Sequence, residues 1–327
     1  MKRLLVVTLL LLVLVAAGCS SSPPGAITPI DTGVDADAWA TVPAGVFPKG
    51  LHDHPTMVDH DYEIMITDVT VEQYAKFLNE ALAAGKINVG AIDVDAGFNV
   101  RKDRLVAPRT VEGAGGYYPG DPYDGHKHEM KILPGEKLYV PLEGDGLRVT
   151  FDGSKFVFDP AYANHPMTMV SWYGANAYCE FYGWRLPTND EWEKAARGTE
   201  LDEKGHGRPF PWGEEIHPNN ANYYASFDPF EDMVGNKLGT TTPVGFYNGK
   251  TYNGYQTLNS ASPYGLYDMA GNVWQWTGDD LPDVHYRYMR GGSYYSYEVD
   301  LRVWKINSSG PETYEPDIGF RCARGGK

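Results

Sequence analysis

The chain has 327 residues, a formal net charge of −15 at pH 7, 8 Trp and 23 Tyr. A nucleic-acid-binding protein needs a basic surface to displace counterions from phosphates, so the acidic balance disfavours that class. The many Tyr and Trp residues, together with 37 Gly, indicate a loop-rich fold with amphipathic surfaces of the kind that often binds ligands.

The first 19 residues have the pattern of an export signal. Lys2 and Arg3 precede an apolar run, 4–17, that is too short to span a bilayer comfortably. Cys19 follows small residues, where a bacterial lipoprotein accepts its lipid, although Ala16 replaces the usual Leu of such signals. We expect 1–19 to be a lipoprotein signal that anchors the exported protein through Cys19 to the cell envelope, in the periplasm or on the outer surface. The alternative is an ordinary cleaved signal with a chance cysteine.

Residues 20–38 lack a hydrophobic period and are rich in Ser, Pro, Gly and Asp. Such a composition is typical of a flexible linker, which here would hold the folded part away from the membrane.

Beyond the linker, three helices are predicted by their capping residues and by apolar residues at helical spacing. Their expected N-caps and stops are Thr70 and Gly85, Ser171 and Gly183, and Thr188 and Gly198. Alternating residues on either side of Asp152-Gly153 predict a β-hairpin over 147–158.

Residues 86–145 are polar and rich in Gly and Pro, which indicates a long variable insertion. Two short segments contain residue types that can bind metals: His126, His128 and Glu129 in the insertion, and His52, Asp53 and His54 before it. Solvated loops are the favoured interpretation of both segments, because neither has a specific metal-ligand spacing.

Three cysteines occur in the chain, Cys19, Cys179 and Cys322. If Cys19 carries lipid, the other two form an even pair in an oxidising compartment, for which a disulfide is the simplest interpretation. Two buried free thiols are the alternative.

Several segments together resemble the formylglycine-generating enzyme family, also called the sulfatase-modifying-factor domain. They are "VPAGVF", "DVTVEQYAKFLN", "HPMTMVSWYGANAYCEFYGWRLPTNDEWEKAARG", "FPWG", "TTPVGFY", "YGLYDMAGNVWQW", "RGGSYYS" and "IGFRCAR", in the family's order. The resemblance implies one α+β domain over 39–327, with a C-type-lectin-like formylglycine-generating-enzyme fold. Small twisted antiparallel sheets, few helices and much irregular structure are expected.

The resemblance also implies a disulfide between Cys179 and Cys322. A second disulfide of some family members would fall on Ala196 and Ile306, so both of its cysteines are missing here.

Calcium is a further implication of the resemblance. The family's two ion sites fall on Asn222, Tyr223, Asn236 and Leu238, and on Asp268, Gly271, Val273 and Gln275. Asn236 and Gln275 stand where the family commonly has Asp and Glu, so fewer carboxylates would hold each ion and the affinity should be weaker. The alternative is that these side chains only hydrogen-bond their own loops.

The family's oxidase binds copper(I) through two cysteines, which this chain replaces by Ser296 and Leu301. Cu(I) selects thiolate ligands, and neither a hydroxyl nor an alkyl group can substitute for them. We therefore expect no copper and no catalytic residue of the family's kind. The preceding segment, 290–293, is interpreted as a structural turn whose glycines supply a positive φ.

A non-catalytic, membrane-tethered binding module is the function that these observations favour. Tyr and Ser make adaptable recognition surfaces, suited to a glycan or a peptide or protein ligand. The candidate ligand-binding residues are Trp274, Ser293, Tyr294, Tyr295, Ser296, Tyr297, Arg302 and Trp304, with Tyr314 nearby. The aromatic side chains could instead fill the core or rim of a closed cleft. Alternative functions are a structural lipoprotein of an envelope secretion or gliding machine, and an oxidase of altered chemistry acting on protein cysteine.

Overall fold

The computed structural model describes residues 29–90, 104–106, 138–142, 146–224, 226–229, 240–280 and 286–326. The predicted signal with Cys19, most of the predicted insertion with His126, His128 and Glu129, and the calcium candidates Asn236 and Leu238 lie outside these residues. Within the described ranges, no helix combines the length and hydrophobicity needed to cross a membrane.

The three predicted helices are present with the expected N-caps, and their C-caps are Ala84, Tyr182 and Gly198, at or one residue before the predicted stops. The helices are α1 (Val71–Ala83), α2 (Trp172–Phe181) and α3 (Asn189–Arg197). Thr70 and Thr188 each form a complete capping box, with Gln73 and Glu191 as the reciprocal partners, and the Ser171 hydroxyl accepts a hydrogen bond from the backbone of α2. Two short 3₁₀-helices, η1 (Pro160–Tyr162) and η2 (Glu298–Leu301), also occur in the described chain.

The described strands form small sheets. One contains β1 (Trp39–Val42), β4 (Tyr62–Met65) and β16 (Ala323–Gly325) in the order β1-β4-β16. Another contains β12 (Trp274–Asp280), β13 (Arg287–Arg290), β14 (Ile306–Ser309) and β15 (Ile318–Phe320) in the order β14-β13-β12-β15. A third contains β5 (Asn88–Gly90), β6 (Arg104–Val106) and β7 (Leu138–Pro141).

Two-stranded hairpins make up the rest: β2 (Gly45–Lys49) with β3 (His54–Val58), β8 (Val149–Phe151) with β9 (Phe156–Phe158), and β10 (Thr251–Tyr252) with β11 (Tyr255–Gln256). The predicted hairpin is therefore confirmed, and Asp152 closes its turn by accepting hydrogen bonds from the backbone of Ser154 and Lys155.

One pairing differs from the expected antiparallel sheets. β15 runs parallel to β12, with Trp274 opposite Ile318. A parallel pair needs a long connection, and the chain between these two strands is long enough to form β13, η2 and β14 before it returns.

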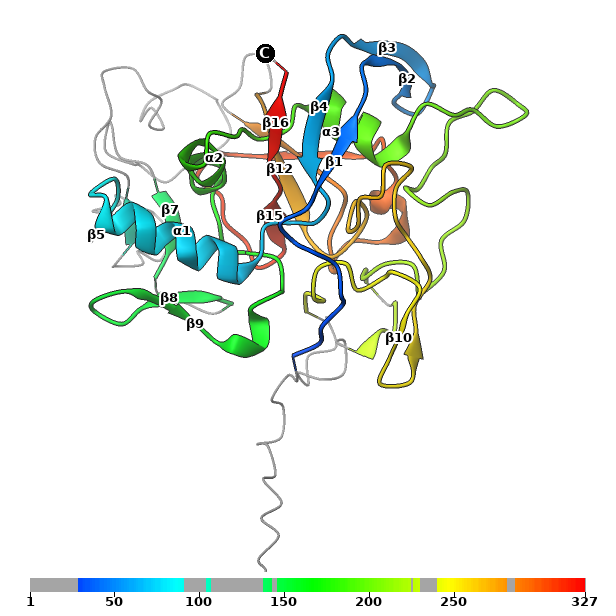
Figure 1. Cartoon of the computed structure of the whole chain (residues 1–327). Coiled ribbons are helices and arrows are strands. Elements are labelled where there is room, and N and C mark those ends of the chain that lie inside the picture. Colours follow the sequence, from blue (N-terminus) through cyan, green and yellow to red (C-terminus); the bar gives the residue numbers. More distant parts are fainter. Residues whose placement is uncertain are drawn as a thin grey trace, which may run out of the picture.

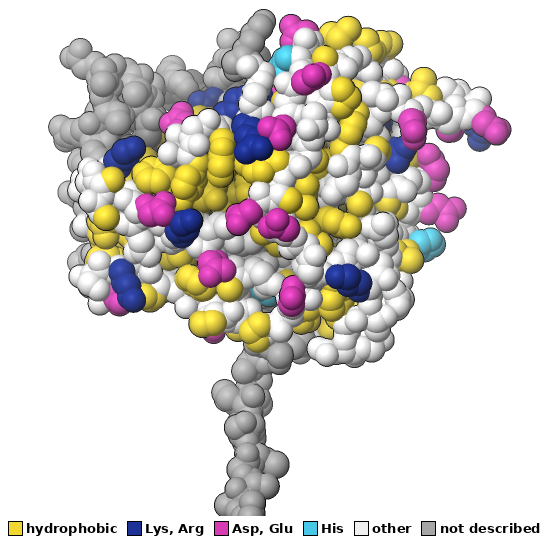
Figure 2. Space-filling model, in the orientation of Figure 1, with side chains coloured by type: hydrophobic (Ala, Val, Ile, Leu, Met, Phe, Trp, Pro, Cys, Tyr) yellow, Lys and Arg dark blue, Asp and Glu magenta, His cyan; other side chains and the backbone are white. Residues whose placement is uncertain are grey.

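β12 and β15 pass through the middle of the molecule, between α1 and α2 on one side and α3 with β1–β3 on the other (Figure 1). A large apolar cluster packs α1 and α2 against β12 and β15, and a second packs α3 against β1, β2 and β4. On the face shown in Figure 2, acidic and basic side chains are interspersed among apolar ones.

Cys179 of α2 and Cys322, between β15 and β16, form a disulfide across 143 residues of sequence. Both cysteines are fully buried in the cluster around α1 and α2. The predicted pairing is confirmed, and two free thiols are excluded. The bond joins α2 to the C-terminal strands, which pair with β4 and with β12.

Candidate functional site

The loop that follows β13 begins with a tight turn at Gly291 and Gly292. Their φ angles are 95° and 73°, which are positive values that glycine adopts without the steric penalty of a Cβ atom. A Cβ atom on Gly292 would also lie 2.9 Å from Leu301 Cδ1. The interpretation of 290–293 as a structural turn is therefore confirmed in its geometry.

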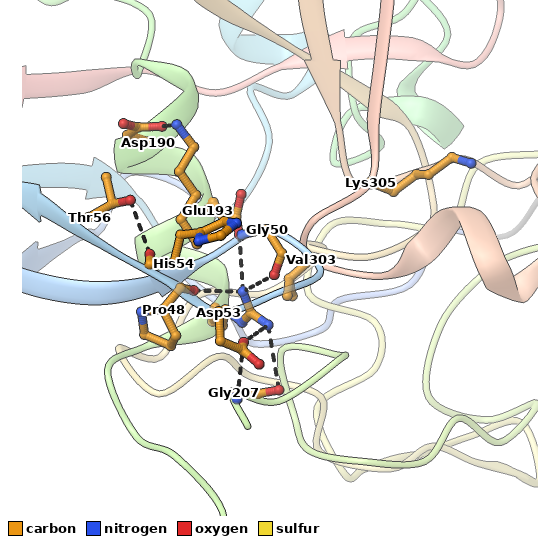
Figure 3. A network of polar contacts seen from close by, with 12 residues as sticks. Pro48, Gly50, Asp53, His54, Thr56, Asp190, Glu193, Gly207, Val303 and Lys305 are labelled. Carbon is orange, nitrogen blue, oxygen red and sulfur yellow. Dashed lines mark hydrogen bonds and ion pairs between the residues drawn. The ribbon is translucent and has the colours of Figure 1, made fainter. Parts of the chain in front are cut away.

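Arg290 holds this turn from within the core. Its guanidinium is fully buried and donates a 2.9 Å hydrogen bond to Glu193 of α3. Glu193 also pairs with Arg197, which donates to Asp53 at 2.7 Å (Figure 3). Burial lowers the pKa of Arg290, and the Glu193 carboxylate opposes that shift. Arg290 is thus a structural residue, and Asp53, one of the metal-binding candidates, is committed to an ion pair with Arg197.

A small polar cluster lies directly after the turn. Ser293 Oγ donates a 2.6 Å hydrogen bond to Asp317 Oδ2, and Ser296 Oγ accepts a 3.0 Å bond from the Ser293 backbone. Burial raises the pKa of Asp317, against the hydrogen bond from Ser293. Both serines are buried, so they support the loop from beneath rather than line its surface.

The exposure prediction is wrong for two aromatic candidates. Trp274 is buried in the cluster around α1 and α2, where its backbone N–H donates to the Asp317 carbonyl. Tyr294 is also buried, and its hydroxyl donates to the Pro316 carbonyl. The backbones of both residues are held by hydrogen bonds, because the Trp274 N–H donates to Asp317, just before β15, and the Tyr294 N–H donates to the Asn272 carbonyl, just before β12.

Tyr295 and Tyr297, by contrast, reach the surface, with 37% and 63% of their surfaces exposed. Tyr297 packs edge to face against Tyr224, 37% exposed, with ring centroids 5.0 Å apart. The Tyr224 backbone N–H donates to the Ser296 carbonyl at 2.9 Å, which ties the two loops together. We call Tyr224, Tyr295 and Tyr297 the tyrosine surface.

The last two candidates lie outside the tyrosine surface. Trp304 is half-buried against the cluster of α3, under the guanidinium groups of Arg197 and Arg302. These cation–π contacts give Trp304 a packing role and leave Arg302 at the rim. Tyr314 is half-buried.

Within the described residues, no group of three or more His, Cys, Asp or Glu side chains is placed to hold a metal ion. The second calcium candidate can also be tested by its hydrogen bonds. Gln275 Oε1 accepts from Trp192 Nε1 and from Arg321 Nε, each at 2.8 Å, while its Nε2 donates to the Asp268 carbonyl. These donors fix the orientation of the amide, and its oxygen faces a guanidinium rather than an open position. Gln275 does not fit a calcium ion.

Asp268 and the neighbouring backbone support the same conclusion. Asp268 Oδ2 accepts a hydrogen bond from the Gly245 backbone, and burial raises the pKa of this carboxyl to about 6. A Cβ on Gly271 would lie 2.4 Å from the Asn222 carbonyl, and Val273 is fully buried in the core. Asp268 and Gln275 are thus engaged by donors of the surrounding packed structure.

Asn222, in the first candidate calcium site, fits a calcium ion better than Gln275 does. Its amide nitrogen donates to the Thr240 carbonyl at 2.7 Å, while its buried Oδ1 has no hydrogen-bond partner. A buried oxygen without a hydrogen-bond partner is suited to bind a cation, because coordination would offset the hydration that the oxygen lost on burial. Tyr223, whose carbonyl would join it, is buried beside it and accepts a backbone hydrogen bond from Ser226.

Comparison with known proteins now identifies the family. Residues 28–325 match the Sulfatase-modifying factor enzyme 1-like domain, which is almost the whole chain. The chain belongs to this family. The fold resembles that of a solved structure described as "Crystal Structure of CarF". The TM-score is 0.53 and the sequence identity 20%, over 88% of this chain and 97% of that chain. The α+β prediction, with few helices and small sheets, is confirmed.

Two curated relatives have sequences similar to parts of this chain. "Serine/threonine-protein kinase pkn1" of Chlamydia caviae is 36% identical over 55% of this chain and 27% of its own length. "Inactive C-alpha-formylglycine-generating enzyme 2" of Bos taurus is 35% identical over 49% of this chain and 50% of its own length. The chain therefore spans between about a quarter and a half of these curated relatives.

Ser296 and Leu301, the positions where the resemblance places the copper ligands of the family's oxidase, differ in their surroundings. Ser296 supports the turn, as described above, whereas Leu301 is fully buried beside Phe210, Tyr223 and Ala270. Leu301 thus fills a core position with an alkyl group.

Two residues of this region were missed by sequence reasoning. Tyr224 belongs to a Tyr-Tyr pair in a loop, and Asp317 stands just before the buried strand β15. Only the tertiary structure brings them to 293–297.

Proposed function

We propose that the chain is a non-catalytic, membrane-tethered binding module of the sulfatase-modifying-factor family, which presents the tyrosine surface to a glycan or peptide ligand. The observation that carries this proposal is the pair of exposed rings, Tyr224 and Tyr297, which pack against each other beside a buried polar cluster. Rings that are fixed before binding lose little entropy on contact and offer both stacking area and hydroxyl groups.

The replaced copper positions support a binding role over the family's oxidation. A hydroxyl at Ser296 and an alkyl group at Leu301 cannot hold Cu(I). The Bos taurus relative, which is named an inactive formylglycine-generating enzyme, is consistent with family members that have no such activity.

Membrane tethering through Cys19 is part of the same proposal, and it rests on the signal pattern of residues 1–19. Incorporation of labelled palmitate into the full-length protein, and its loss in Cys19→Ala, would support the anchor. Equal labelling of both proteins would contradict it.

Ligand binding can be tested with the protein lacking residues 1–28, against a printed array of natural glycans and a displayed library of random peptides. We expect a ligand from one of these sets to lose at least about tenfold in affinity with Tyr297→Ala, which corresponds to about 1.4 kcal/mol. Leu201→Ala, another exposed apolar residue on a separate loop, is the matched control and should bind normally. No ligand in either set, or equal loss in both variants, would contradict the proposal.

The oxidase alternative needs its own assay. The protein would be incubated with copper, oxygen and a cysteine-containing client peptide, and the peptide analysed by mass spectrometry. Formylglycine formed with repeated turnover would overturn the non-catalytic proposal, and an unchanged peptide supports it.

A further inference from the structure

A cleft of about 510 Å³ lies away from the tyrosine surface, between α2, the start of α3 and the far end of β12. Trp274 at the start of β12 lies near the polar cluster, whereas Gly278 and Asp279 near its end line the cleft. Five residues of extended strand separate Trp274 from Asp279, or about 16 Å. The cleft is therefore distinct from the site described above, and its size falls within the range of small-molecule pockets.

One wall of the cleft is a stripe of side chains on α2. Trp172, Asn176 and Glu180 are spaced four residues apart, so they lie on one face of the helix, over a length of about 12 Å. Among the residues that the structure describes, the Asn176 amide and the Glu180 carboxylate have no side-chain hydrogen-bond partner. Both groups are free to bind a ligand.

Trp172 is held in place before any ligand binds. Its Nε1 donates a 2.7 Å hydrogen bond to the Thr277 carbonyl, and the Arg287 guanidinium lies 4.3 Å from the ring centroid. The half-buried indole therefore offers the cleft a fixed apolar surface.

Other lining residues of the cleft carry charges that are already paired. Arg185 binds Glu191 through two hydrogen bonds of 2.6 Å, and His60 Nε2 lies 2.8 Å from the same carboxylate. These contacts balance the charge of Glu191. The other carboxylates that line the cleft are Glu180 and Asp279, and Asp279 accepts a hydrogen bond from the Asn189 backbone N–H. An anionic ligand would be repelled by these carboxylates.

The backbone of the cleft excludes one common mode of peptide binding. Strand addition requires a free sheet edge, but the Gly278 N–H already donates to the Pro187 carbonyl at 2.8 Å. What the cleft offers is a flat indole with planar amide and carboxylate groups beside it. The carbon-bound hydrogens of a sugar ring pack on an indole, and planar polar groups hydrogen-bond adjacent hydroxyls. We propose that this cleft is a second binding site, for a neutral saccharide.

The test uses the protein lacking residues 1–28, labelled with ¹⁵N, and three neutral probes at millimolar concentration: lactose, maltotriose and N,N′-diacetylchitobiose. The Trp172 indole N–H signal, assigned by its loss in Trp172→Phe, should shift with at least one of them. Asn176→Ala and Glu180→Gln should each weaken that probe at least about tenfold. Glu72→Gln, an exposed glutamate on α1, and Tyr297→Ala should leave its affinity unchanged.

Three results would overturn the proposal. One is the absence of any shift at Trp172 with all three probes. Another is binding that Asn176→Ala and Glu180→Gln leave intact. The third is a shift at Trp172 with tetralysine but with none of the saccharides, which would assign the cleft to a cationic peptide. Because Tyr297→Ala removes only the tyrosine surface, failure of that surface and failure of the cleft are measured separately.

Discussion

Tyr224 and Tyr297 lie 73 positions apart in the sequence, yet their rings pack edge to face with centroids 5.0 Å apart. The contact joins the loop after β13 to the segment around Tyr224, and it is reinforced by the backbone hydrogen bond to Ser296. An aromatic pair of this geometry contributes energy beyond the area that it buries.

The coupling of these two rings can be measured with a double-mutant cycle of Tyr224→Ala and Tyr297→Ala in urea unfolding. We expect a coupling of about 0.5–1 kcal/mol, at the low end for aromatic pairs because both rings are partly exposed. A cycle of Tyr297→Ala with Leu201→Ala should be additive. A coupling near zero in the first cycle would show that the rings do not restrain each other in solution.

Removal of the buried arginine of the turn should be costly. Arg290→Met leaves Glu193 buried with one partner fewer, and we expect the free energy of unfolding to fall by about 3–5 kcal/mol. Arg324→Met breaks a half-exposed pair with Glu63 and should cost less than about 1 kcal/mol. Similar losses in the two variants, measured by denaturant unfolding, would contradict the structural role of Arg290.

The disulfide should stabilise the fold mainly by restricting the unfolded chain. For a loop closed across 143 residues, the chain-entropy treatment gives about 4–5 kcal/mol. The double variant Cys179→Ala/Cys322→Ala should lose this amount in the free energy of unfolding, and a reducing agent should have no further effect on it. Wild-type protein whose stability is unchanged by reduction would count against this expectation.

Calcium, if it binds this chain, should act through Asn222 rather than Gln275. We expect added calcium to raise the melting temperature of the wild type relative to the chelator EGTA, and Asn222→Ala to abolish that rise. Gln275→Leu should lower the melting temperature equally with calcium and with EGTA. The reason is that the Gln275 amide oxygen accepts hydrogen bonds from Trp192 and Arg321, which the leucine cannot do. A calcium-dependent rise that persists in Asn222→Ala would place the ion elsewhere.

His60 should make stability depend on pH. Hydrogen bonds to Glu191 and then to Asp59 raise the pKa of His60, against a smaller opposing effect of burial. A raised pKa in the folded state means that the protonated form is favoured by folding. The stabilisation is full below the unfolded value of about 6.5 and is lost as the pH rises through the higher folded pKa.

His60→Gln should therefore be less stable than the wild type at pH 5.5 by up to about 1 kcal/mol, a figure reduced by solvent screening. At pH 9 the two proteins should differ less. The measurement is the urea midpoint across this range, with the exposed His206→Gln as a control. A difference between wild type and His60→Gln that is independent of pH would contradict the assignment.

The capping boxes, the hairpin turn and the disulfide partners could be predicted from the sequence, because each depends on local residue types or on a family motif with few alternatives. Thr70, Thr188 and Asp152 act on backbone groups within three residues of themselves. The parallel pairing of β15 with β12 could not be predicted in this way, since it depends on where a long segment of chain returns.

The sequence by itself determined that Ser296 and Leu301, the positions where the resemblance to the family places copper-binding cysteines, are not thiols, because residue identity does not depend on the fold. The tertiary structure alone decided which aromatic residues face outward. Tyr294 and Tyr297 are similar side chains three positions apart, yet Tyr294 is buried with its hydroxyl on the Pro316 carbonyl, while Tyr297 is exposed against Tyr224. Exposure in an irregular loop depends on neighbours distant in the sequence, and no local period encodes it.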